Sequence, residues 1–89
     1  MPSPKNINAW TEEDWRNQHS ALDIAGDWHR FRSCQAWYQY LGGWLWIKSY
    51  STLVAGICGH EIHRRGYYSR TTSKQITQIY NAHVRNTLD

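Results

Sequence analysis

The sequence predicts an α+β domain, with an N-terminal helix, a small antiparallel sheet of three or four strands, and a C-terminal amphipathic helix packed on one face. Residues 45–58 are dense in aromatic and β-branched side chains, which suit a pleated, half-buried surface. After residue 74 the apolar side chains recur at helical spacing, which stacks them on one helix face. Because 89 residues suffice for one domain, we expect a flexible leader over residues 1–8 and a single domain over residues 9–89.

The first predicted helix begins after a capping signal. Thr11 opens the sequence Thr-Glu-Glu-Asp, which is typical of a helix start because acidic side chains favour the positive end of the helix dipole. We expect a helix from about Glu12 to Ile24, ended by Gly26 as its C-cap. Its apolar stripe consists of Trp15, His19 and Leu22. The segment that follows, residues 27–33, is either a strand or a loop that carries arginine into solvent.

Turn signals divide the region of the predicted sheet. Two aromatic runs, residues 34–41 and 44–47, flank Gly42-Gly43, which is the pattern of a hairpin whose turn needs positive φ. We expect the second run to continue as one strand to Val54. Its alternation is lost near Ser49, which predicts a bulge or a strand covered on both faces. Further turns are expected at residues 59–60 and 64–66, around a return strand at residues 60–63.

A run of hydroxyl side chains, Ser69–Ser73, precedes the last predicted helix. These hydroxyls suit N-capping, and the flanking cations Arg70 and Lys74 also allow a phosphate site at the helix N-terminus. The predicted buried stripe of this helix is Ile76, Ile79, Tyr80 and Val84. Its predicted outer side chains are Lys74, Gln78, Asn81 and Arg85.

Aromatic side chains are the most distinctive feature of the composition, with six Trp and six Tyr. Strand alternation sends the rings of the aromatic hairpin to opposite faces, so we expect some of them to be exposed beside basic residues. Such a surface suits either a protein-binding hot spot or a platform that stacks single-stranded bases. Protein binding ranks first because the net charge is only +3 and the RNA-binding consensus is absent. The predicted partner-binding residues are Trp44, Trp46, Lys48, Arg64, Arg65, Tyr67, Arg70 and Lys74.

Residue patterns that carry chemistry are weak in this chain. The grouping of Cys58, His60 and His63 lacks the paired spacing of zinc ligands, and no glycine-rich nucleophile turn is present. We therefore expect no catalysis, no metal and no cofactor. The mean hydropathy of −0.76, and the lack of an apolar run of about 20 residues, favour a protein without a membrane span. Two cysteines fit reduced thiols, so the expected location is the cytoplasm.

Two short motifs in the second half of the chain carry a resemblance. Ser49–Ala55 reads Ser-Tyr-Ser-Thr-Leu-Val-Ala, and Tyr68–Lys74 reads Tyr-Ser-Arg-Thr-Thr-Ser-Lys. This pair resembles a motif pair found in small uncharacterised proteins of phages and other mobile elements. The resemblance implies a mobile-element protein that binds and sterically blocks a host defence complex, a protein or ribonucleoprotein, as anti-CRISPR inhibitors do. The alternative is a small basic nucleic-acid-binding accessory protein. Both leave the oligomeric state open.

Overall fold

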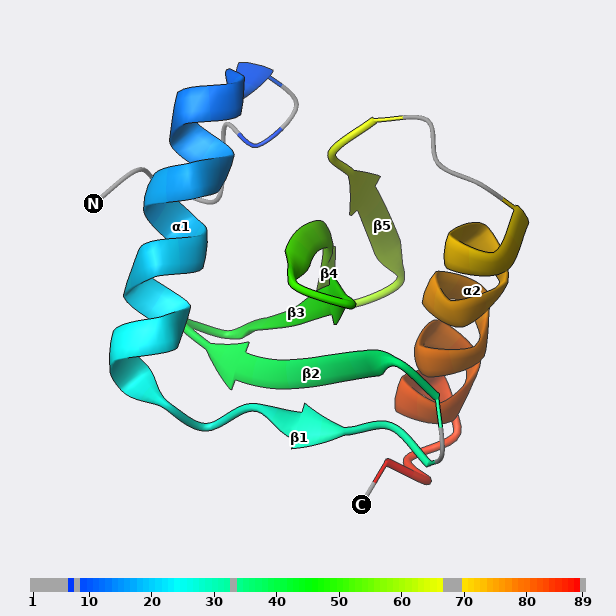
Figure 1. Ribbon diagram of the computed structural model, residues 1–89. Coiled ribbons are helices and arrows are strands. Elements are labelled where there is room, and N and C mark those ends of the chain that lie inside the picture. The colour runs from blue at the N-terminus through cyan, green and yellow to red at the C-terminus, as the bar shows by residue number, and fades with distance from the viewer. Residues whose placement is uncertain (1–6, 8, 33, 67–69, 89) are drawn as a thin grey trace.

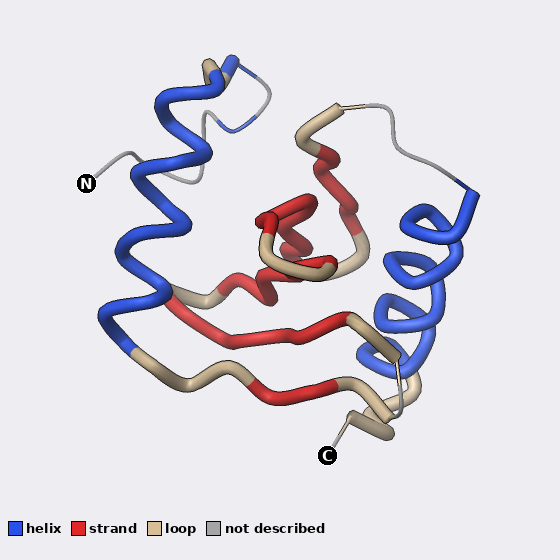
Figure 2. The backbone as a smooth tube through the Cα atoms, viewed as in Figure 1, coloured by secondary structure: helices blue, strands red, loops and turns tan. Residues whose placement is uncertain are grey.

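The computed structural model describes residues 7, 9–32, 34–66 and 70–88, and it forms three layers, a sheet between two helices (Figure 1). In chain order the elements are α1 (Glu12–Ala25), β1 (His29–Arg30), β2 (Ala36–Leu41), β3 (Trp44–Ser49), β4 (Thr52–Cys58), β5 (Glu61–Arg64) and α2 (Arg70–Val84). The five strands pair antiparallel in sequence order, and each hairpin follows the one before it (Figure 2). The predicted α+β class is confirmed, and the sheet is larger than the three or four strands expected.

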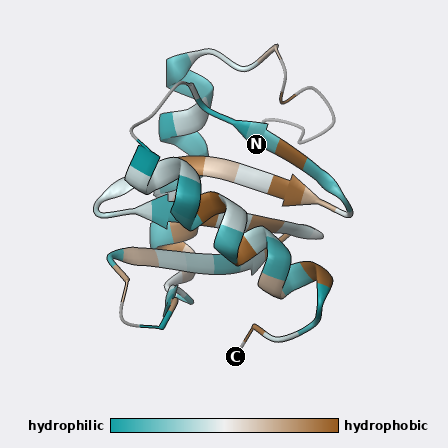
Figure 3. Ribbon diagram, turned by 90° about the vertical axis from the view of Figure 1, so that its right-hand side faces the viewer, coloured by the Kyte–Doolittle hydropathy of each residue, from teal (hydrophilic) through white to brown (hydrophobic). Residues whose placement is uncertain are grey.

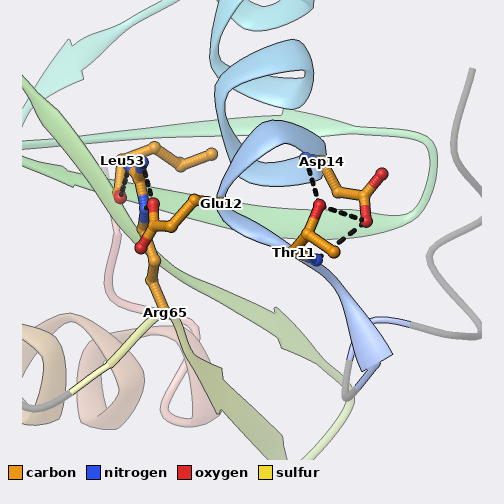
Figure 4. A network of polar contacts seen from close by, with 5 residues as sticks. All are labelled: Thr11, Glu12, Asp14, Leu53 and Arg65. Carbon is orange, nitrogen blue, oxygen red and sulfur yellow. Dashed lines mark hydrogen bonds and ion pairs between the residues drawn. The ribbon is translucent and has the colours of Figure 1, made fainter.

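Both ends of α1 are capped as the sequence predicts. The backbone N–H of Asp14 donates to Oγ1 of Thr11 (3.3 Å), and the Asp14 carboxylate accepts from the Thr11 backbone N–H (2.8 Å; Figure 4). At the other end Gly26 adopts φ 72°, a left-handed conformation that glycine reaches without strain, and donates to Leu22 O (3.0 Å). These local bonds satisfy backbone groups that a helix end would otherwise leave unpaired.

The glycine pair forms the predicted hairpin turn, whereas the next connection differs from the expectation. Gly42 and Gly43 have φ values of 64° and 81°, which closes β2 onto β3. The prediction of one strand through Val54 is wrong, because the chain reverses at Tyr50, whose φ is 56°. The bulge predicted near Ser49 is confirmed, because Ile47 and Lys48 are adjacent in β3 while their partners in β4, Ala55 and Leu53, leave out Val54.

Each face of the sheet has its own apolar core. The core beneath α1 consists of Ile7, Trp15, Leu22, Trp44, Trp46 and Leu53. The core beneath α2 contains Tyr38, Leu45, Ile47, Val54, Ala55, Ile57, Ile76, Ile79 and Ala82, with Phe31 and Ala36. Because β3 and β4 are covered on both faces, these two strands carry apolar side chains almost continuously. Ile7 is the one residue of the predicted leader that the structure describes, and the remainder of residues 1–8 lies outside the described residues.

The inner face of α2 agrees only in part with the predicted stripe. Ile76 and Ile79 are fully buried as expected, and Tyr80 is half-buried at the margin. The prediction for Val84 is wrong, since this side chain is 44% exposed. At about 100° per residue, Val84 lies about 140° around the helix from Ile79 and so leaves the face that contacts the sheet. Buried polar side chains, Thr72 and Gln75, occupy the first two turns of this face.

Candidate functional site

Two of the predicted partner-binding aromatics lie in the core. Trp46 is fully buried and Trp44 is 8% exposed. The two rings stack at 5.5 Å between centroids, and Trp10 also stacks on Trp46 at 5.8 Å. The expectation that these two Trp rings are exposed is therefore wrong, because α1 covers this face of the sheet. The third predicted anchor, Tyr67, lies outside the described residues.

The predicted cations have different environments in the structure. Arg65 donates from Nε to Oε2 of Glu12 (2.7 Å) and from Nη1 to the carbonyl of Leu53 (3.1 Å), which ties the end of β5 to α1 (Figure 4). This hydrogen bond from Arg65 holds the pKa of Glu12 below its usual value. Lys48 lies with Nζ 4.4 Å from the ring centroid of Trp28. Arg64, in contrast, is exposed. Arg65 thus has a structural role, and the predicted set does not form one surface.

The two motif segments of the sequence meet in space. Ser49, at the end of β3, donates from Oγ to Oε1 of Gln75 (2.8 Å), and its Oγ lies 3.5 Å from Oγ1 of Thr72. All three side chains are buried, so these hydrogen bonds satisfy polar atoms that would otherwise be costly in the core. The contact fixes the β3–β4 turn onto the first turns of α2. It gives the paired motifs a structural role.

Cations gather on the outer face of α2, which lies across the strands in Figure 3. We define the basic stripe as Arg70, Lys74, Gln78, Asn81 and Arg85. At about 100° per residue these five side chains fall within an arc of about 80°. Four of them are exposed, and Gln78 is half-buried. The stripe follows the helix axis for about 22 Å, at a rise of about 1.5 Å per residue.

Arg32 joins the basic stripe from another part of the chain. A shallow pocket of about 190 Å³ lies between the loop after β1 and the last turns of α2. Its lining includes Arg32, Gln78, Asn81 and Arg85. Arg32 has φ 54°, which holds this exposed side chain in a loop conformation that non-glycine residues rarely adopt. The sequence predicts an exposed arginine here but not its position beside α2, because nothing in residues 27–33 shows that the loop lies against this helix.

Charge is divided along the chain. Residues 28–89 contain eight Lys or Arg and two acids, Glu61 and Asp89, whereas residues 1–27 contain two Lys or Arg and five acids. α1 carries three acids in its first turn, and α2 has no acidic residue at all. The helices lie on opposite faces of the sheet, so the acids of α1 and the cations of α2 lie on opposite sides, although Arg65 and Lys48 contact residues on the α1 side. The net charge of +3 conceals this separation.

Metal ligands do not converge among the described residues. Within residues 7, 9–32, 34–66 and 70–88, no three His, Cys, Asp or Glu side chains lie close enough together to hold an ion. Cys58 and His60 are exposed at the β4–β5 turn, and His63 lies against Trp44, 5.4 Å between ring centroids. Neither described helix combines the length and apolar character that crossing a bilayer requires.

The fold and the charged surface define a small α/β/α domain with one acid-free basic helix. The chain belongs to a family of unknown function, DUF8033, whose profile matches residues 16–88. The match covers α1 from its second turn, the whole sheet and α2. No curated protein and no solved structure shows significant similarity to the chain.

Proposed function

We propose that this protein is a non-enzymatic binding protein whose ligand is the sugar–phosphate backbone of nucleic acid, held against the basic stripe and Arg32. The main support is that α2 carries no acid and that its outer face gathers Arg, Lys, Gln and Asn side chains. These are residue types that commonly donate to phosphate oxygens. Two of the three predicted aromatic anchors, Trp44 and Trp46, are buried, which weakens the case for a protein partner.

The dimensions of the basic stripe suit this ligand. Along about 22 Å of helix axis, a duplex presents about six phosphates on each strand at about 3.4 Å spacing. The four cations Arg32, Arg70, Lys74 and Arg85 therefore have enough phosphates within reach.

The position of Arg70 gives the proposal independent support. Arg70 is the first residue of α2, where the positive end of the helix dipole disfavours a cation by about 0.3–1 kcal/mol. α1 shows the opposite pattern, with Glu12, Glu13 and Asp14 in its first turn. Helix stability thus does not account for Arg70, whereas an anionic ligand at this helix end does.

Charge-removing variants test the proposal through the salt dependence of binding. With four cations, the slope of log K against log salt for a short DNA duplex should lie between about −3 and −4. Lys74→Gln and Arg85→Gln should each weaken binding and reduce the magnitude of this slope by about 1. The matched control is Arg16→Gln, which removes one exposed charge from α1 and should leave the slope unchanged. Binding that is absent, or an equal loss in the control, would contradict the proposal.

A second candidate function is the one that the phage resemblance implies, inhibition of a host defence complex in the bacterial cytoplasm. The observation that favours it is Tyr50, which is 60% exposed at the β3–β4 turn, within the first motif. Its φ of 56° is uncommon for a bulky residue, and such conformations gather at functional sites. An exposed Tyr is also a frequent anchor in protein interfaces.

Replacing Tyr50 by Asn separates this candidate from the first. Asn tolerates the left-handed conformation, so we expect Tyr50→Asn to keep the Tm and lose the ring. If a host protein is the ligand, capture of that protein from a nuclease-treated bacterial lysate should fail with this variant. If Tyr50→Asn still captures the host protein, Tyr50 is not an anchor of the interface. If nuclease treatment removes every partner of the wild-type protein, the ligand is nucleic acid and the first candidate function is favoured.

A further inference from the structure

A pocket of about 400 Å³ opens where β1 and β2 meet the C-terminal end of α2. We call it the aromatic pocket, and its lining residues are His29, Tyr38, Tyr40, His83, Asn86 and Leu88. None of these side chains belongs to the basic stripe, although Arg85 directly precedes Asn86 in the chain. The pocket is larger than a single planar ring system, and it is open to solvent.

The rings of the aromatic pocket are held in place by one another. His29 and Tyr38 are register partners in neighbouring strands, and their rings stack at 5.5 Å with an angle of 30° between planes. The Tyr40 hydroxyl lies 3.0 Å from Nδ1 of His83, which links β2 to the last turn of α2. Burial raises the pKa of Tyr40, so its hydroxyl keeps its proton at neutral pH, although the residue as a whole is 53% exposed.

The end of α2 fixes Asn86 at the rim. Its backbone N–H donates to His83 O (3.1 Å), and the N–H of Thr87 donates to Ala82 O (2.8 Å). With φ 57° at Asn86, these bonds form a Schellman motif, in which the residue after the helix takes the left-handed conformation. The backbone of Asn86 is thereby fixed beside the rings that line the pocket, and its side-chain amide has both donor and acceptor atoms.

Electrostatics select the class of ligand. The C-terminal end of a helix is the negative end of its dipole, which disfavours an anion inside the aromatic pocket. Cations are disfavoured too, since Arg30 and Arg32 line an adjoining pocket that shares Tyr38 with it. A neutral, flat ring with hydrogen-bonding edges fits the interior, and a phosphate attached to that ring fits the arginines outside.

We infer that the aromatic pocket takes one unpaired base of a single-stranded nucleic acid, whose neighbouring phosphates contact Arg32 and Arg85. The exposed ring of Tyr40 supplies a stacking surface, and the amide of Asn86 contacts the base edge. A base inside a duplex is stacked and paired and cannot enter without being extruded. This inference rests on the proposed function and narrows its ligand to single strands.

Three oligonucleotides with the same number of phosphates test the inference by fluorescence anisotropy at one salt concentration. They are a mixed-sequence single strand, a single strand of equal length whose bases are replaced by abasic sites, and a duplex with that number of phosphates in total. The single strand should bind about tenfold more tightly than the abasic strand, since stacking of one base on an aromatic side chain accounts for a difference of this size. We expect the duplex to bind no more tightly than the abasic strand.

Two variants test whether the difference in affinity between the single strand and the abasic strand arises in the aromatic pocket. Tyr40→Leu removes the ring, and Asn86→Gly removes the amide while glycine keeps the left-handed conformation. Both should reduce single-strand affinity to that of the abasic strand and leave abasic binding unchanged. The matched control is Tyr50→Leu, which removes an exposed tyrosine from outside the pocket and should retain the tenfold difference. If Tyr40→Leu fails to fold, Asn86→Gly decides alone.

The outcomes separate this inference from the proposed function. Equal, salt-dependent binding of the single and abasic strands by the wild-type protein would overturn the base pocket and leave backbone binding intact. A tenfold difference that survives both Tyr40→Leu and Asn86→Gly would place the base elsewhere and also overturn the inference. Absence of binding to all three oligonucleotides would overturn both.

Discussion

Gly56 lies where the sheet can accept no side chain. A Cβ built at this position would lie 2.6 Å from Cζ3 of Trp46 and 3.3 Å from Cε3 of Trp44. Both rings are buried and stacked, so neither can move away easily. The close packing of the α1 core therefore depends on the absence of a side chain in β4.

The first prediction is that Gly56→Ala lowers the free energy of unfolding by about 1–3 kcal/mol, the usual effect of overpacking a core. Urea denaturation measures it. Gly66→Ala is the control, because no heavy atom lies within 4 Å of a Cβ built there. An unchanged denaturation midpoint for Gly56→Ala would contradict the packing described for Trp46.

A second residue-scale prediction concerns acid stability. Arg65 lowers the pKa of Glu12 in the folded protein from its usual value of 4.5, so the pair stabilises the fold above pH 4.5. This contribution is lost as the pH falls through the folded-state pKa. The Tm of Glu12→Gln should therefore fall less than that of the wild-type protein as the pH decreases below 4.5. Arg65→Gln should give the same reduction, and the double variant no more than either. Additive effects of the two variants would show that the groups do not interact.

At the scale of elements, α2 has an inner face that is buried against the sheet and an outer face that is exposed to solvent. Ile79 is fully buried at the centre of the inner face, and Val84 is 44% exposed near the helix end. Ile79→Asp should lower the free energy of unfolding by about 3 kcal/mol or more, because an unpaired charge would be buried. Val84→Asp should change it by less than about 0.5 kcal/mol. Thermal unfolding checks both, and similar losses for the two variants would contradict the orientation of α2.

The elements that the sequence predicts correctly are those fixed by local chemistry. Thr11, Gly26 and the Gly42-Gly43 turn each act through bonds or dihedral angles within a few residues, so their effects are visible in the sequence. Tyr50 was missed as a turn because a bulky residue at positive φ has no local signal. The environment of Trp46 depends on which face α1 covers, and strand alternation does not contain that information.

The candidate site was predictable only in part for the same reason. Lys74, Gln78, Asn81 and Arg85 follow from helical periodicity and were expected on the outer face of α2. Arg32 joins them only through tertiary contact, as the shared pocket shows. The aromatic pocket likewise combines side chains of β1 and β2 with side chains at the end of α2, which lies more than forty residues further along the chain.

At the scale of the whole molecule, the distribution of charge matters more than its sum. A modest net charge argues against nucleic-acid binding only if the charges are mixed over the surface. Here the acids are concentrated in and after α1, and the cations lie mostly in residues 28–88. The proposed function predicts that a polyanion orients the molecule with α2 toward it and α1 away from it.

The most direct test of this account is a site-resolved titration of the ¹⁵N-labelled protein with a short single-stranded oligonucleotide, followed by backbone amide shifts. We predict that the largest changes fall on residues 70–88, on Arg32 and on Tyr40, and that added salt reverses the changes on the basic stripe. The amide shifts of α1 should not change, because that helix lies on the opposite face of the sheet from α2. Changes concentrated on α1, or a spectrum that does not change at all, would contradict the assignment of α2 as a nucleic-acid-binding surface.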